Sequence, residues 1–213
     1  MAMQTEWNEN KILLRGRVAA PPQFSHSNHG VDYYLFPLTV LRLSGAEDRI
    51  NIVASAPMLE RHPLAPGDRT ALMGQVRSYN NKSGVGSRLV ITVYVREFLP
   101  DSGLEEDENH LTLAGTICKP PSLRSTPLGR VICDMILAVN RRYGRADYLP
   151  CIAWGSLAHQ CGQMEVGGRL RLEGRLQSRT YTKVLPEGTQ ERVAYEISVM
   201  GLSPAPEPET EPA

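Results

Sequence analysis

The stretch "NKILLRGRVAAPP", Asn10 to Pro22, decides the fold because the chain contains it twice. Starting at Asn109, the sequence reads "NHLTLAGTICKPP", which repeats the asparagine, the glycine and the paired prolines. In both stretches apolar and polar residues alternate, as is typical of a strand with one buried face. The Pro-Pro pair ends the strand because proline cannot donate a hydrogen bond to a sheet. We therefore expect a tandem duplication.

The match continues in the same register far beyond the first strand. Further matched residues are Gly30 with Gly129, Arg42 with Arg141 and, after one inserted residue, Gly74 with Gly174. Each copy contains five runs typical of strands, with a short helical segment between the third and the fourth. This plan predicts an OB-fold barrel, whereas an immunoglobulin-like sandwich would need about seven shorter strands. We expect an all-β chain of two tandem five-stranded OB-fold barrels, and two final strands joined by "NNKSGVG" in the first copy and "TKVLPEGTQE" in the second.

The charge distribution supports this division. The chain is formally neutral, yet each copy carries a net charge of +5, while the N-terminal, linking and C-terminal segments carry −2, −5 and −3. Basic bodies flanked by acidic segments suggest a polyanion as partner. The predicted organisation is a flexible N-terminal segment at 1–9, a divergent first barrel at 10–100, an acidic linker at 101–108, a second barrel at 109–203 and a disordered tail rich in proline and glutamate at 204–213.

A basic row stands out in the second copy, in "RLRLEGRLQSRTYTK", Arg169 to Lys183. The even positions are apolar or small, and the odd positions are mostly basic, with a tyrosine near the end. If the strand is regular, alternation places Arg171, Arg175, Arg179, Tyr181 and Lys183 on one face. Gly174 is a possible site for a bulge that would change this facing.

The second copy resembles the bacterial single-stranded DNA-binding protein family. The resemblance rests on "MILAVNR", "DYLPCIAWGSLAHQCGQ", "GGRLRLEGRLQSRTYTK" and "YEISVMGL", and it covers Asn109 to Leu202. One branch of that family carries two OB folds per chain and pairs as homodimers, so the resemblance implies a dimer presenting four barrels. It also implies sequence-independent binding of single-stranded DNA by stacking aromatics and phosphate-facing cations.

The resemblance assigns individual residues to this role. It carries the family's stacking positions onto Tyr148, Trp154, Tyr181 and Tyr143, and a basic position onto Arg124. With the cations of the basic loop and the basic row, the predicted nucleic-acid set is Arg124, Arg141, Arg142, Tyr143, Arg145, Tyr148, Trp154, Arg171, Arg175, Arg179, Tyr181 and Lys183. Tyr148 and Trp154 also suit core positions, and any single arginine also suits a solvated surface.

The first copy lacks this stacking set. The positions of Tyr148, Trp154, Tyr181 and Tyr143 fall on Arg49, Ser55, Asn81 and Ser44. Candidates that remain there are Arg77, Tyr79 and Lys82, with Tyr33, Tyr34 and Tyr94 as possible replacements. We therefore expect the second barrel to dominate binding, and the first to serve dimerisation, geometry or weaker backbone contact.

Other functions find less support in the sequence. No run approaches a membrane span, no signal peptide precedes the first strand, and the four cysteines have no metal-like spacing. No phosphate loop or hydrolase motif suggests an enzyme or a cofactor. We expect a cytoplasmic, nucleoid-associated protein acting in DNA replication, recombination, repair or mobile-element transfer. The alternatives are a primosome-like OB-fold adaptor for proteins and a binder of single-stranded RNA. The tip "PETEPA" lacks the family's terminal hydrophobic residue, which puts recruitment of replication or repair proteins through it in doubt.

Overall fold

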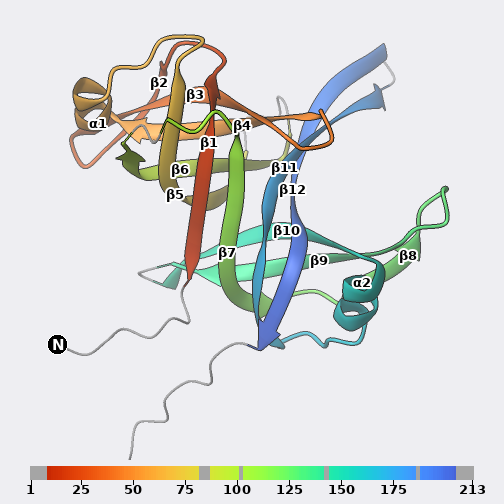
Figure 1. The fold of residues 1–213 in the computed structure, drawn as a ribbon. Helices are drawn as coiled ribbons and strands as arrows, with labels where there is room; N and C mark the ends of the chain where they lie inside the picture. Colours follow the sequence, from red (N-terminus) through yellow and green to blue (C-terminus); the bar gives the residue numbers. More distant parts are fainter. Residues whose placement is uncertain (1–8, 82–86, 101–102, 142–143, 186–187, 205–213) are drawn as a thin grey trace, which may run out of the picture. The chain divides into compact units, whose positions relative to one another are not determined.

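The computed structural model describes residues 9–81, 87–100, 103–141, 144–185 and 188–204. Contacts group Lys11–His110 with Leu176–Tyr195 into one unit, and Leu111–Arg175 with Met1–Asn10 and Glu196–Ala213 into another. We call them the first and the second unit. Each contains one barrel (Figure 1). The predicted domain boundaries themselves stay a prediction.

The first barrel follows the predicted order of strands. Its elements are β1 (Asn10–Val18), β2 (Gln23–Asn28), β3 (Val31–Leu41), β4 (Glu47–Ser55), α1 (Ala56–Arg61), β5 (Arg69–Asn80) and β6 (Leu89–Leu99). β1 pairs with both β3 and β5, β3 pairs with β4, and β5 pairs with β6, all antiparallel. The parallel pairing of β4 with β6 closes the ring. This closed ring of five strands is the OB-fold barrel that the sequence predicts.

The second barrel repeats the plan with β7 (Glu108–Ile117), β8 (Ser122–Ser125), β9 (Val131–Asn140), β10 (Ala146–Trp154), α2 (Gly155–Gly162), β11 (Arg169–Leu185) and β12 (Gly188–Pro204). β7 pairs with β9 and β11, β9 pairs with β10, and β10 pairs in parallel with β12, which neighbours β11. The all-β class, the two barrels and the short helix after the third barrel strand are confirmed.

Closure requires a glycine at the same place in both barrels. A Cβ on Gly16 would lie 2.2 Å from the carbonyl oxygen of Thr39, and a Cβ on Gly115 would lie 2.6 Å from that of Ala138. Real Cβ atoms do not approach a carbonyl this closely, so only glycine permits the first strand of each barrel to cross the second. Gly16 and Gly115 are therefore repeated in the sequence because both barrels contain the same strand crossing.

Two predictions about strands were incomplete. Each copy has a short additional strand, β2 or β8, which pairs with the edge of β3 or β9 after the Pro-Pro pair. Both are almost fully exposed, so they carry no alternation of apolar residues that a sequence could show. The loop expected at 182–191 is mostly strand, because β11 continues to Leu185 and β12 begins at Gly188. The loop of the first copy falls largely outside the described residues.

The β11 glycine does not form the bulge considered from the sequence in its pairing with β7. Register is continuous from Arg169 opposite Thr116 to Gly174 opposite Leu111. Instead, a Cβ on Gly174 would lie 2.3 Å from the carbonyl oxygen of Ser198. The glycine thus permits close packing between strands.

The outer part of the β11–β12 hairpin, Leu176–Tyr195, belongs to the first unit, and we call it the hairpin arm. The backbone amide of Ser178 donates to Asp48 Oδ1 at 2.6 Å, and the Tyr195 hydroxyl donates to the carbonyl oxygen of Arg49 at 3.0 Å. Burial raises the pKa of Tyr195 to about 12. The arm therefore contacts the start of β4.

Candidate nucleic-acid interface

Two aromatic side chains lie exposed on β10, one near each end of the strand. The strand alternates, so Leu149 and Ala153 are fully buried while Tyr148 and Trp154 are 53% and 39% exposed. Both rings therefore lie on the outer face of the barrel, and neither is a core residue. Six residues of strand separate them by roughly 20 Å. A Tyr or Trp ring on an outer face can stack on any base, because every base has a π face.

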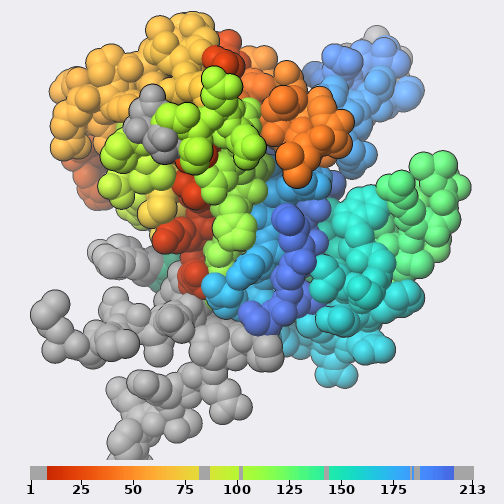
Figure 2. Space-filling view, in the orientation of Figure 1, coloured from red at the N-terminus to blue at the C-terminus, as the bar shows by residue number. Residues whose placement is uncertain are grey.

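A cation lies in the same cross-strand row as Trp154. On β9, Ile132 pairs with Trp154 of β10 on one side and with Arg124 of β8 on the other. Residues directly opposite one another point to the same face, so the Arg124 and Trp154 side chains share the outer face, from backbone positions about 10 Å apart. The hairpin from β8 to β9 projects from the barrel in Figures 1 and 2.

Arg124 also has a carboxylate partner. Its side chain, half exposed, forms an ion pair with Asp134 on β9. The hydrogen bond from Arg124 to Asp134 raises the pKa of the guanidinium. With or without this bond, the guanidinium is charged at physiological pH. Exposed ion pairs contribute little energy, so a phosphate can compete with Asp134 for this cation.

The basic row of β11 is only partly regular. Arg171 donates to Glu9 Oε2 at 2.7 Å and also contacts Glu173, and these carboxylates raise its pKa. Alternation then fails at Gln177, which is buried although its neighbours at odd positions are not. The even face stays apolar at Leu172 and Leu176, as predicted.

The end of β11 belongs to the hairpin arm and forms a separate group. The guanidinium carbon of Arg179 lies 5.8 Å from the centroid of the Tyr181 ring, within range of a cation–π contact. Arg179 is exposed and Tyr181 is half-buried. Arg175, earlier in the strand, is half-buried, and Lys183 lies on the described strand although its side chain is not described.

Arg141 has a structural task that the sequence did not reveal. It forms a bidentate pair with Asp147, whose carboxylate is fully buried. The first barrel has the same pair, because Arg42 donates to the fully buried Asp48 at 2.7 Å. A buried carboxylate requires a cation or hydrogen-bond donors, so this arginine stabilises the fold in both copies.

The rest of the predicted basic loop is described only in part. Arg145 is exposed, whereas Arg142 and Tyr143 lie outside the described residues. The repeat contained a signal for the Arg141–Asp147 pair that sequence reasoning missed. In both copies the matched arginine is followed six residues later by an aspartate inside an alternating strand.

The weaker candidates of the first barrel differ from one another. Tyr79 is 52% exposed, Arg77 donates to Gln75 Oε1 at 2.5 Å, and Lys82 lies outside the described residues. Sequence reasoning assigned no role to Phe24 or His26, whose rings contact those of Tyr34 and Tyr33.

The cysteines form no metal site in the part of the chain that the structure describes. Cys133, Cys151 and Cys161 are buried, and burial raises the pKa of the Cys161 thiol to about 11 and that of Cys151 further. Such thiols stay protonated at neutral pH, so they are poor ligands and poor nucleophiles.

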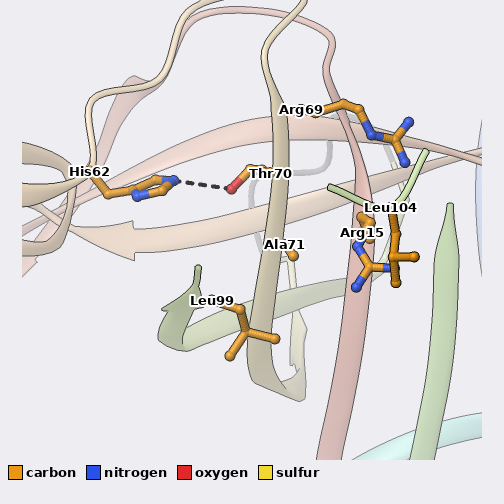
Figure 3. Close-up of a pocket in the computed structure, with 7 residues that line it drawn as sticks. All are labelled: Arg15, His62, Arg69, Thr70, Ala71, Leu99 and Leu104. Atoms are coloured by element: carbon orange, nitrogen blue, oxygen red, sulfur yellow. Dashed lines mark hydrogen bonds between the residues drawn. The ribbon is translucent and has the colours of Figure 1, made fainter. Parts of the chain in front are cut away.

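One small cavity lies beside β5, between Arg15, His62, Arg69 and neighbouring apolar side chains (Figure 3). Its volume is about 50 Å³, which suits water and is too small for a nucleotide. Arg69 and Arg15 already pair with Asp107 and Glu108. No helix in the described residues is long and apolar enough to cross a membrane.

The fold and the exposed aromatic and basic residues define a protein with two OB-fold barrels, and comparisons with known proteins refine this class. Residues 108–203 match the family model described as the Single-strand binding protein family. The second copy thus matches this family over essentially its whole length, and the resemblance predicted from the sequence is confirmed.

Individual relatives agree with this assignment. The Single-stranded DNA-binding protein 2 of Listeria innocua serovar 6a is 32% identical over 80 residues, which cover 34% of this chain and 50% of that protein. The Single-stranded DNA-binding protein A of Bacillus subtilis is 34% identical over 80 residues, covering 34% of this chain and 46% of that protein. The chain thus spans about half the length of the curated relatives it matches.

A solved structure matches along the whole chain. The wild-type single-stranded DNA binding protein from Thermus aquaticus has a TM-score of 0.74 with this chain at 19% sequence identity, and the match covers 96% of each chain. At this level of identity the likeness concerns the fold, and it extends over both copies.

Proposed function

We propose that this protein binds single-stranded DNA without regard to sequence and that the second barrel contributes most of the affinity. The observation that carries the proposal is the pair of exposed rings, Tyr148 and Trp154, on the outer face of a barrel that matches the single-strand binding protein family. Rings in this position stack on bases, at roughly 1 to 3 kcal/mol per base. Arg124 shares the row of Trp154 and suits a phosphate.

Further basic and aromatic residues are proposed to contact the strand. Four of them, Arg175, Arg179, Tyr181 and Lys183, lie on β11. The other three, Arg142, Tyr143 and Arg145, come after β9 in the sequence. Arg141 and Arg171 are weaker members, because their guanidinium groups already pair with carboxylates. Each phosphate that a cation neutralises adds about −0.7 to the slope of log affinity against log salt for a single strand.

The biological setting is proposed from the family resemblance. The protein acts as a binder without catalytic activity in DNA replication, recombination, repair or mobile-element transfer, in the cytoplasm and on the nucleoid. It forms a homodimer with four barrels. At roughly 4 to 16 nucleotides per barrel, such a dimer would occupy several tens of nucleotides.

Tryptophan fluorescence tests the proposal directly. The chain has two tryptophans, so a Trp7→Phe variant leaves Trp154 as the one reporter. Titration with oligo-dT is expected to quench the emission of Trp154, and the affinity is expected to fall steeply between 50 and 200 mM salt, as is typical when phosphates are contacted. Unchanged emission together with no complex in a gel shift would overturn the proposal. Equal affinity for oligo-U would extend the ligand to RNA.

A further inference from the structure

Three rings gather on the first barrel: His26 on β2, Tyr33 on β3 and Tyr94 on β6. The imidazole of His26 stacks on the ring of Tyr33, with centroids 5.0 Å apart and planes inclined by 6°. The ring of Tyr94 lies 6.1 Å from that of Tyr33, and its hydroxyl lies 3.3 Å from Nε2 of His26, at hydrogen-bond distance. We call these three residues the first-barrel platform.

The platform lies on the outer face of the barrel. On β3, Phe36 and Leu38 are fully buried in the core, and Tyr33 belongs to the opposite, odd-numbered set. On β6, Tyr94 lies between the buried residues Val93 and Val95 and therefore points away from the core. All three platform residues are half-buried. Since the core does not need these rings, their gathering on one outer surface calls for another explanation.

The strand register relates the platform to the second barrel. In the first barrel, Tyr33 pairs with His26 on one side and with Ser55 on the other. In the second barrel, the equivalent row is Arg124, Ile132 and Trp154. Ser55 stands where the second barrel has the ring of Trp154, while rings occupy the other two positions of the row, His26 on β2 and Tyr33 on β3. The first barrel has therefore lost the stacking position of the second and gained others in the same row.

Cations border the platform. Gln75 of β5 pairs with Tyr94 of β6, and its Oε1 accepts hydrogen bonds from Arg96 Nη2 at 2.6 Å and from Arg77 Nη2 at 2.5 Å. One neutral amide thus holds two guanidinium groups next to the rings. Within the described residues, Arg96 forms no ion pair with a carboxylate. The surface pairs flat π faces with positive charge, which complements the bases and phosphates of a single strand.

We propose that the first barrel binds bases of single-stranded DNA on this platform, at positions that differ from those of the second barrel. The inference rests on the proposed function, because it assigns a second contact surface for the same ligand. The hydrogen bonds of the hairpin arm reach Asp48 and Arg49 at the start of β4 and Ser87 before β6. Tyr33 instead pairs with Ser55 at the end of β4.

Photo-crosslinking locates the contact. The full chain is irradiated with oligo-dT in which some thymidines are replaced by 5-iododeoxyuridine, and the crosslinked tryptic peptides are identified. Cleavage after Lys and Arg releases the platform in peptides 18–42 and 89–96, and the second barrel's rings in peptide 146–169. Peptide 89–96 contains Tyr94 as its one aromatic residue, so a crosslink there identifies that ring. We expect crosslinks in all three peptides.

Paired variants measure the contribution to affinity. Tyr33→Ser with Tyr94→Ser removes the stacking faces, whereas Tyr33→Phe with Tyr94→Phe keeps them and removes the hydroxyls. We expect the serine pair to weaken binding to a long oligo-dT at least about fivefold, and the phenylalanine pair to change it less than about twofold. A thermal melt of each variant checks that it is folded, and crosslinking of the phenylalanine pair tests the platform even if the serine pair is unstable.

The outcomes separate the two proposals. Crosslinks in 18–42 and 89–96 with loss of affinity in the serine pair support the platform. Crosslinks confined to 146–169 with unchanged affinity in a folded serine pair overturn the platform and leave the proposed function intact. An oligonucleotide that neither binds nor crosslinks overturns both.

Discussion

The two barrels share the residues that build the fold and differ in the residues that face outward. Gly16 and Gly115 permit the same strand crossing, and Arg42–Asp48 and Arg141–Asp147 form the same ion pair. Outside this scaffold, Trp154 corresponds to Ser55, and Tyr148 to Arg49. Duplication thus preserved what the barrel requires and left the outer faces free to diverge. This difference separates fold residues from binding residues within one chain.

The largest effect is expected from breaking the shared ion pair. Arg141→Met removes the ion-pair partner of the fully buried Asp147 carboxylate and should lower the free energy of unfolding by roughly 3 to 5 kcal/mol. Urea denaturation measures the change, and Arg145→Met, at an exposed position in the same loop, is the matched control with an expected change below about 0.5 kcal/mol. If Arg141→Met instead weakens DNA binding without loss of stability, Arg141 is a binding residue and not a fold residue.

Next in size is the contrast between two tyrosines near the hairpin ends. Tyr181→Ala removes the ring beside Arg179 and is expected to weaken oligo-dT binding by about 1 to 3 kcal/mol, whereas Tyr79→Ala should have a smaller effect. Fluorescence anisotropy with a labelled oligonucleotide measures both affinities. Equal losses would contradict the view that the second copy dominates binding.

The smallest effect concerns the carboxylate beside Arg124. Asp134→Asn removes its ion-pair partner and leaves the guanidinium available to a phosphate, so the affinity for oligo-dT at low salt should rise by at most about 1 kcal/mol. Arg124→Gln should do the opposite and reduce the salt slope by about 0.7. A lower affinity in folded Asp134→Asn would show that the ion pair itself positions the contact.

The repeat made the barrels predictable, because two divergent copies agree where the fold demands a residue. The repeated glycines, the prolines and the alternation of apolar residues fixed the order of the barrel strands. β2 and β8 escaped prediction because both faces of these edge strands meet solvent, which leaves no apolar pattern.

The candidate site was predictable in part. The resemblance indicated Tyr148 and Trp154, which the structure places on the outer face, but their role in binding stays a prediction. Arg141 was interpreted as a phosphate contact because it belongs to a basic stretch of sequence, which does not reveal its ion pair with the buried Asp147. The buried Gln177 interrupts the basic row. The sequence did not predict this, because alternation along a strand does not show what covers each face.

The central claim is that the exposed rings of β10 bind single-stranded DNA, and one measurement tests it most directly. The affinity of the double variant Tyr148→Ala with Trp154→Ala for oligo-dT is compared with that of the unmodified chain at low salt, after a thermal melt has shown both to be folded. At roughly 1 to 3 kcal/mol per stacked base, the variant should bind at least about 30-fold more weakly. An unchanged affinity would contradict the account.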